Sequence, residues 1–226
     1  MSNIYAGQTT TTALVQTGDT TGNLVLQTCS TPTTAMTISS SQIVNFANAP
    51  TVAGAALPSG AMSLISTQTA SNSASLSWTG LTGYNSYVLM LKNLKPSSGV
   101  DNLVLVVGTG STPTYITSGY YYVGIGVNNT TTITDSSLSA SYISIDPGHV
   151  ITSTDGLNSS LTLSGFTSDN FALTGTATNY YNSLQANALV RGAGLPSNST
   201  AKTAIKINFL ATNIGSGTAS LYGISS

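Results

Sequence analysis

The segment Ala204-Ile-Lys-Ile-Asn-Phe-Leu210 decides the fold class, because apolar and polar side chains alternate along it. In an extended strand, successive side chains point to opposite faces of the sheet. Ile205, Ile207 and Phe209 therefore share one face, and the polar residues between them share the other. A helix would need a period near 3.6 residues, which this segment lacks. The segment predicts a β-strand with one buried face.

Similar short segments, separated by Gly, Pro, Asn and Asp turns, fill the chain from Met62 onwards. The run Tyr87–Leu94 is almost wholly apolar and predicts a central strand covered on both faces. Because helical periodicity is nearly absent and turn signals are regular, we expect an all-β protein built on an antiparallel β-sandwich. We expect its strands at Met62–Thr67, Ala74–Trp78, Tyr87–Leu94, Leu103–Gly108, Tyr120–Val127, Ser139–Asp146, Ser160–Phe166, Phe171–Thr178, Ala188–Gly192, Ala204–Thr212 and Thr218–Ile224.

The composition restricts the chemistry available to the chain. Five cationic and six acidic residues among 226 give a net charge of −1, whereas Ser and Thr together number 70. Ordinary soluble domains carry about a quarter charged residues. The cations Lys92, Lys95, Arg191, Lys202 and Lys206 are too few and too dispersed to follow a phosphate backbone, so we expect no nucleic-acid partner. A charge so close to zero gives little repulsion between copies and suits assembly.

The titratable residues predict no enzyme, metal site or cofactor. His149 lies in the turn Asp146-Pro-Gly-His149, and no nucleophile motif accompanies it. Asp135, Asp146, Asp155 and Asp169 are expected in or beside loops, where Asp commonly forms turns. Ca²⁺ binding by these loops stays an open alternative, although there is no Asp-x-Asp-x-Asp spacing and the chain has no Glu.

The chain also lacks signals for membranes and secretion. No run of 18 apolar residues is present, so we expect no membrane insertion. The start, Met1-Ser-Asn-Ile-Tyr-Ala6, has neither the basic nor the apolar region of a secretory signal. The single cysteine, Cys29, excludes an intrachain disulfide and is expected to be a small packing residue. We expect a protein made in the cytoplasm of its host and released by another route.

Residues 1–60 differ from the rest of the chain. Two hairpin-like segments, residues 13–28 and 35–46, each place two short apolar strands around a polar turn. An isolated hairpin is marginally stable in water, so this part needs a partner surface. Residues 47–60 are rich in small residues and Pro and are typical of a linker. We therefore expect an extended N-terminal β-hairpin arm over residues 1–60 and a β-sandwich over residues 61–226.

Four segments carry a resemblance to phage proteins. Thr21-Gly-Asn-Leu-Val-Leu-Gln-Thr28, followed by residues 35–46, resembles the arm of phage fibre proteins. Residues 73–91 and the ending Gly215–Ile224 resemble the opening and closing strands of jelly-roll-like modules in phage virion proteins. The resemblance, which covers about a third of the chain, implies a jelly-roll-type sandwich in a fibre or decoration protein on the virion surface. It also implies a homotrimer that contacts other virion proteins through its arm.

Tyrosines are the main candidates for contact residues. Tyr120, Tyr121 and Tyr122, and likewise Tyr180 and Tyr181, place consecutive rings on opposite faces of a strand. Tyrosine combines a large apolar area with a polar hydroxyl and suits both subunit interfaces and sugar stacking. We expect a non-enzymatic structural protein in which these rings pack between subunits. The alternative is a receptor-binding module that recognises a host-surface glycan through the same rings.

Overall fold

A computed structural model of the chain describes residues 24–28, 33–39, 41, 44–46, 51–52, 55–56, 62–128, 131–146, 151–167, 170–181, 184–195 and 200–224. These residues form strands, turns and connecting segments and contain no helix. The chain divides into two compact units, Met1–Ser59 and Gly60–Ser226. The division lies beside the boundary that the sequence predicts after residue 60.

The first unit contains a three-stranded antiparallel sheet and one short hairpin. Its strands are β1 (Leu24–Thr28), β2 (Thr33–Ile38), β3 (Val44–Phe46), β4 (Thr51–Val52) and β5 (Ala55–Ala56). Pairing of β2 with β3 confirms the predicted hairpin within residues 35–46. β1 pairs with β2. The first strand of the predicted hairpin of residues 13–28 falls on residues that the structure does not describe. Residues 13–23 lie outside the described residues.

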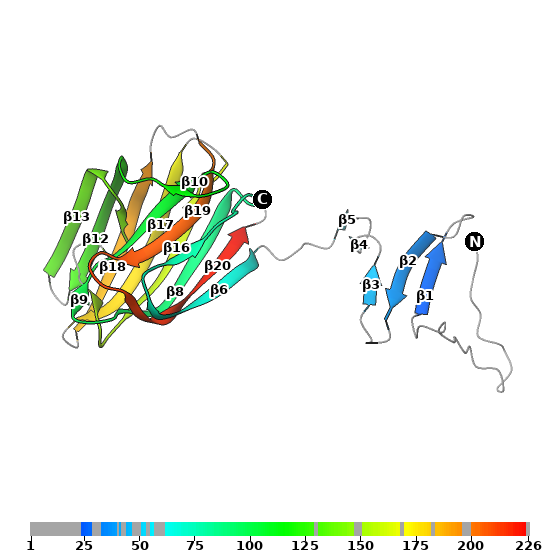
Figure 1. The fold of residues 1–226 in the computed structure, drawn as a ribbon, viewed down its shortest axis with the longest axis horizontal. Helices are drawn as coiled ribbons and strands as arrows, with labels where there is room; N and C mark the ends of the chain where they lie inside the picture. The colour runs from blue at the N-terminus through cyan, green and yellow to red at the C-terminus, as the bar shows by residue number, and fades with distance from the viewer. Residues whose placement is uncertain are drawn as a thin grey trace. The chain divides into compact units, whose positions relative to one another are not determined.

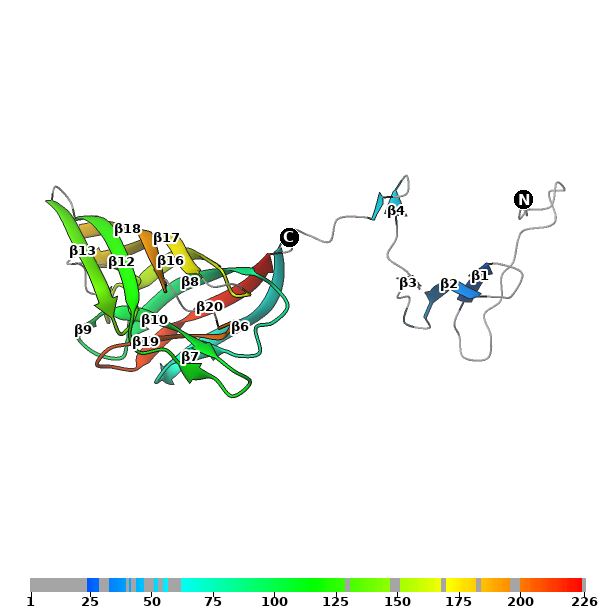
Figure 2. The ribbon, with the colours of Figure 1, turned by 90° about the horizontal axis from the view of Figure 1, so that it is seen from above.

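The second unit is a sandwich of two antiparallel sheets, seen as two layers in Figure 2. The larger sheet has eight strands in the order β13 (Thr131–Ala140), β12 (Tyr120–Asn128), β18 (Leu184–Leu195), β17 (Phe171–Tyr181), β16 (Leu157–Ser164), β8 (Ser86–Pro96), β20 (Ile214–Ile224) and β6 (Met62–Ser73). In the smaller sheet, β7 (Leu76–Trp78), β19 (Lys202–Phe209) and β10 (Leu103–Thr109) are followed by β11 (Thr114–Tyr115) and β14 (Ile143–Ser144), which share one edge of β10. β9 (Val100–Asp101) pairs with β15 (Ile151–Thr152). The predicted all-β antiparallel sandwich is confirmed.

Four strand pairs of the sandwich nest inside one another. β6 pairs with β20, β7 with β19, β8 with β16, and β10 with β14. The first and third pairs belong to the larger sheet, and the second and fourth belong to the smaller sheet. The chain therefore follows the path of one long hairpin folded across two layers. At its open end, Met62 and Ile224 are direct strand partners.

Two insertions widen the larger sheet from four strands to eight. The hairpin β12–β13 is inserted between β10 and β14, and the hairpin β17–β18 is inserted between β16 and β19. The two insertions join because β12 pairs with β18. Figure 1 shows β13, β12 and β18 together at one side of the sandwich. This part of the sheet carries the candidate site described below.

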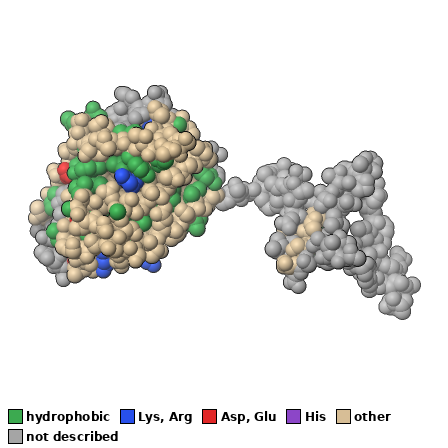
Figure 3. Space-filling view, viewed as in Figure 1, with side chains coloured by type: hydrophobic (Ala, Val, Ile, Leu, Met, Phe, Trp, Pro, Cys, Tyr) green, Lys and Arg blue, Asp and Glu red, His purple; other side chains and the backbone are tan. Residues whose placement is uncertain are grey.

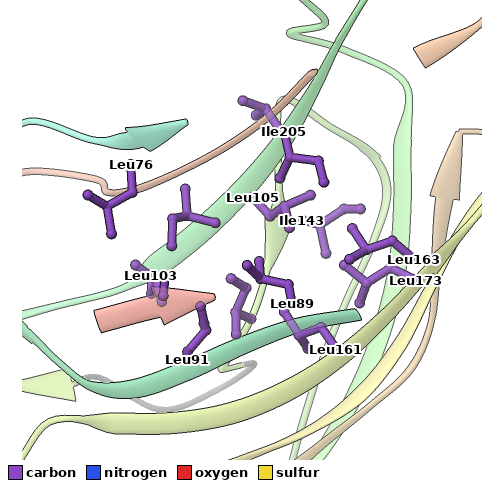
Figure 4. Close-up of a cluster of buried hydrophobic side chains, with 14 of the residues drawn as sticks. Leu76, Leu89, Leu91, Leu103, Leu105, Ile143, Leu161, Leu163, Leu173 and Ile205 are labelled. Atoms are coloured by element: carbon purple, nitrogen blue, oxygen red, sulfur yellow. The ribbon is translucent and has the colours of Figure 1, made fainter. Parts of the chain in front are cut away.

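The core lies between the two sheets and is built from inward-facing apolar side chains. In β16 the exposure alternates residue by residue, with Leu157, Leu161 and Leu163 fully buried. The segment that decides the fold class behaves as predicted, since Ile205 and Ile207 are fully buried and Phe209 is 2% exposed. Figure 4 shows leucines and isoleucines from both sheets converging on this layer.

The structure corrects the prediction of a strand covered on both faces at Tyr87–Leu94. These residues lie in β8, where Met90 on the outer face is 45% exposed within the chain. The strand with both faces buried is β10, in which every residue from Leu103 to Val107 is at most 8% exposed. A mostly apolar run shows that both faces of a strand carry apolar side chains. It does not show whether other parts of the same chain cover both faces.

The structure also corrects the boundaries of two strands. Residues 131–140 form β13, whereas the sequence predicts a loop around Asp135 and a strand starting at Ser139. The predicted strand Ser139–Asp146 is divided between the end of β13 and the short β14. Polar Ser and Thr fill β13, and they pair with β12 through backbone hydrogen bonds that need no apolar pattern.

A buried carboxylate holds the connection between β19 and β20. Oδ2 of Asp101 accepts hydrogen bonds from the Ala211 N–H at 2.9 Å and from the Thr212 N–H at 2.8 Å. The Thr212 hydroxyl donates to the same oxygen at 2.9 Å, and Oδ1 accepts from the Asn102 N–H. Burial raises the pKa of Asp101, but the hydrogen bonds outweigh burial, so the pKa lies below its usual value. The Asp101 side chain thus supplies the acceptor for two backbone N–H groups of this turn.

Two leucines test how the core contributes to stability. Leu105→Ala should lower the free energy of unfolding by about 2–5 kcal/mol, because it leaves a cavity in a fully buried layer. Leu138→Ala, at a position 77% exposed, should change it by less than about 0.5 kcal/mol. Urea unfolding of both variants measures the difference, and equal effects would contradict the position of the core.

Candidate functional site

The three consecutive tyrosines of β12 are divided between the two faces of the larger sheet. Tyr120 is fully buried and Tyr122 is half-buried, whereas Tyr121 is 43% exposed. Tyr121 and Tyr122 pair in register with Gly194 and Ala193 of β18, whereas the pairing of β12 with β13 shifts its register between Tyr120 and Tyr122. The predicted alternation of the rings is therefore present in the structure, and it leaves Tyr121 and Tyr122 accessible on opposite faces.

The sequence predicts Tyr120 as a contact residue, but the structure places its ring in the core, where it is fully buried. Its hydroxyl accepts a hydrogen bond from the Val107 N–H at 2.9 Å and donates to the Ile116 carbonyl at 3.1 Å. Burial raises the pKa of Tyr120 to about 12, although the bond from Val107 lowers it in part. The ring fixes β12 against the edge of β10 that β11 and β14 leave unpaired. It is inaccessible to a subunit or a sugar in this structure.

Tyr122 lies beside the carboxylate of Asp135 on the face that looks toward the smaller sheet. Gly124 and Asp135 are direct partners across β12 and β13, and Tyr122 is two residues from Gly124, so all three share one face. The Tyr122 hydroxyl donates to Asp135 Oδ2 at 3.3 Å. Burial, the charge of Asp135 and the nearby Tyr142 phenol raise the pKa of Tyr122 to about 12. The pair joins an aromatic ring to a half-buried anion.

A second aromatic pair lies on the smaller sheet. The ammonium group of Lys206 is 4.3 Å from the centre of the Tyr115 ring, within the range of a cation–π contact. Tyr115 is the strand partner of Gly108, where an added Cβ would come within 3.2 Å of the ring. The absence of a side chain at Gly108 lets this ring lie against β10. Tyr142 precedes Ile143, which pairs with Leu105 on the same edge of β10.

The half-buried tyrosines Tyr115, Tyr122 and Tyr142 all pack against the core cluster. Figure 3 shows hydrophobic side chains gathered in a band across one face of the sandwich. A Lys or Arg side chain lies within the band, and an Asp or Glu side chain lies at its margin. Among the named side chains, Tyr122 with Asp135 joins an aromatic ring to a carboxylate, and Tyr115 with Lys206 joins an aromatic ring to an ammonium group. Such groups can stack on and hydrogen-bond a polar, uncharged ligand.

The remaining predicted residues contribute less to the site. Asp146 is buried, and Asp155 accepts a hydrogen bond from the Thr152 hydroxyl within its own turn. Tyr180 and Tyr181 lie in β17, but their side chains fall outside the described residues. His149, Cys29 and Asp169 also lie outside the described residues.

Sequence reasoning did not identify Tyr115, Tyr142 or Lys206 as members of the site. None of them stands in a repeated pattern. Each lies on, or directly before, a strand that pairs with β10. The described residues contain no group of three or more His, Cys, Asp or Glu that could hold a metal ion. They also contain no helix long and apolar enough to cross a membrane. The chain matches no protein-family model, no curated protein and no solved structure.

The buried Tyr120 and the half-buried Tyr122 predict that the fold is sensitive to alkaline pH. Because the folded-state pKa values of Tyr120 and Tyr122 lie above the ordinary value, their neutral forms stabilise the fold fully below pH 10, and this contribution is lost as the pH rises toward 12. The free energy of unfolding should therefore fall across that window. Tyr120→Phe should reduce the fall, while at neutral pH it should cost about 1–3 kcal/mol because the Val107 N–H loses its partner.

Denaturant unfolding at several pH values measures both effects. The control is Tyr121→Phe, which alters an exposed ring on the other face and should change the neutral-pH value by less than about 0.5 kcal/mol. An unchanged slope between pH 10 and 12 in Tyr120→Phe would contradict the role assigned to this phenol.

Proposed function

We propose that the chain is a non-enzymatic structural protein of a bacteriophage virion, a short fibre or a capsid or tail decoration component that assembles as a homotrimer. The observation that carries the proposal is the state of the two edges of the larger sheet. β6 has 12 residues without a charge or a proline, and β13 has 10 residues with one charge, Asp135. Folded monomers usually protect such edges with charges, prolines or bulges, because unpaired backbone groups bind other strands. Each edge strand has one register shift, in the pairing of β6 with β20 and in the pairing of β13 with β12.

Exposed apolar side chains extend the β6 edge onto the outer face of the sheet. Met62, Leu64 and Ile65 are 44%, 57% and 40% exposed. Leu64 pairs with Tyr222 of β20, which in turn pairs with Val88 of β8, so the apolar surface crosses three strands. Extended apolar patches on soluble domains commonly mark contacts with other proteins. A second copy of the chain, with its near-zero net charge, could cover this surface without electrostatic repulsion.

The nested strand pairs support the virion assignment. The four nested strand pairs alternate between the two sheets. This order is similar to the double Greek key of a jelly roll, a fold that occurs in viral capsid proteins. We therefore assign the second unit to the jelly-roll type, with two inserted hairpins. In this proposal the first unit is the arm that binds other virion proteins, and the sandwich faces outward on the particle surface. Of the tyrosines on which the receptor-binding alternative rests, Tyr122 is the one that lies beside a carboxylate, that of Asp135.

Self-association gives the first test of this proposal. Light scattering after size-exclusion chromatography should give the mass of three chains at micromolar concentration. Leu64→Lys should weaken the assembly by about tenfold or more, because it places an ammonium group in an apolar contact. Thr176→Lys, an exposed position away from the edge on the same sheet, is the matched control and should leave the mass unchanged. A wild-type chain that stays monomeric would refute the trimer.

Truncation tests the assignment of the arm. A chain beginning at Gly60 should fold, since the described core lies wholly in the second unit. It should no longer bind particles that lack the protein, whereas the full chain should bind them. Cosedimentation of each form with such particles measures attachment. Attachment of the truncated chain would place the contact in the sandwich instead.

A further inference from the structure

The carboxylate of Asp135 has acceptor capacity that the described residues do not use. Within the described part of the chain, its one hydrogen-bond donor is the Tyr122 hydroxyl, at 3.3 Å. Charge-assisted O–H···O⁻ bonds are usually about 2.5–2.7 Å long, so this contact is a weak one. An ionised carboxylate can accept about four hydrogen bonds. Because Asp135 is only half-buried, its remaining acceptor positions are open to a ligand.

Two tyrosines lie near this carboxylate. Tyr122 donates to it, and the Tyr142 phenol is close enough to Tyr122 to interact with it electrostatically; both rings are half-buried against the core. A ring fixed in this way loses little conformational freedom when a ligand stacks on it. Tyr121, the neighbouring tyrosine, is exposed on the opposite face of β12 and is isolated from this group.

The combination of groups selects one ligand chemistry. A pyranose ring has an apolar C–H face that packs on an aromatic ring, and its neighbouring hydroxyls can both donate to one carboxylate. A cation fits poorly, because Ca²⁺ takes six to eight oxygen ligands and the site provides a single carboxylate. An anionic sugar fits poorly as well, since Asp135 would repel it. A neutral sugar satisfies the open acceptors without adding charge.

We propose that Tyr122, Asp135 and Tyr142 form a binding subsite for one ring of a neutral saccharide. The carboxylate of Asp135 accepts two vicinal hydroxyls, and a tyrosine ring packs against the C–H face of the sugar. The site is independent of the β6 edge, so it does not depend on the assembly proposed above.

The test uses the full chain and a panel of neutral sugars, namely glucose, galactose, mannose, rhamnose and N-acetylglucosamine. Saturation-transfer NMR at millimolar sugar should detect at least one of them. Asp135→Asn keeps the shape of the side chain and removes its charge, and it should weaken binding by about tenfold or more. Tyr142→Leu keeps apolar bulk but removes the aromatic face, and it should also weaken binding by about tenfold.

Matched controls distinguish the subsite from general stickiness or loss of fold. Tyr121→Leu removes an exposed ring from the other face of the same strand and should bind as the wild type does. Asp155→Asn removes a carboxylate from a turn outside the site and should also bind normally. The urea midpoint of each variant verifies folding, and Asp135→Asn should unfold at the wild-type midpoint.

Three results would overturn the proposal. The first is no saturation transfer to any sugar of the panel. The second is full binding by Asp135→Asn, and the third is equal loss of binding in Tyr121→Leu. A shift of the Asp135 and Tyr122 resonances with Ca²⁺ alone, without any response to sugar, would assign the carboxylate to a cation and would also overturn it.

Discussion

Burial of apolar side chains between the two sheets is the interaction on which the whole sandwich depends. With five cationic and six acidic residues in 226, ion pairs can add little to stability, and exposed pairs contribute only about 0–1 kcal/mol each. The layer that includes Leu89, Leu105 and Ile205 therefore carries the hydrophobic free energy, and the strand ladders satisfy the backbone. The buried acid Asp101, with its several hydrogen bonds, serves to hold a turn beside this layer.

Because charged residues are few, the surface of the larger sheet has two regions that differ in chemical character. The outer face near β6 is apolar and uncharged, with Leu64 in register with Tyr222. The region around β12 and β13 is aromatic and carries the half-buried Asp135. A contact between copies at the first region would leave the second accessible, since the two occupy opposite edges of the eight-stranded sheet. Assembly and sugar recognition are therefore compatible in one molecule.

The fold class was predictable from the sequence because alternation is a local property. Ile205, Ile207 and Phe209 point inward as their spacing requires. Alternation divides Tyr120 from Tyr121 correctly, but it cannot say which ring faces the core, since that depends on the unpaired edge of β10. For the same reason the meeting of Tyr122 with Tyr142 was unpredictable, because the register of β14 on β10 is set by distant residues. The strand around Asp135 was missed because Ser and Thr pair as well as apolar residues do in an edge strand.

The nested pairing has a consequence for the order in which the sandwich can form during synthesis. Met62, at the start of the second unit, finds its strand partner in Ile224, close to the end of the chain. A ribosome releases the chain from the N-terminus at about 5–20 residues per second, so β6 lacks its partner strand until β20 emerges. Contacts between such distant segments also slow folding, because the loop must close before they can form. The uncharged β6 is thus exposed to neighbouring nascent chains, and its acquisition of β20 completes the sandwich last.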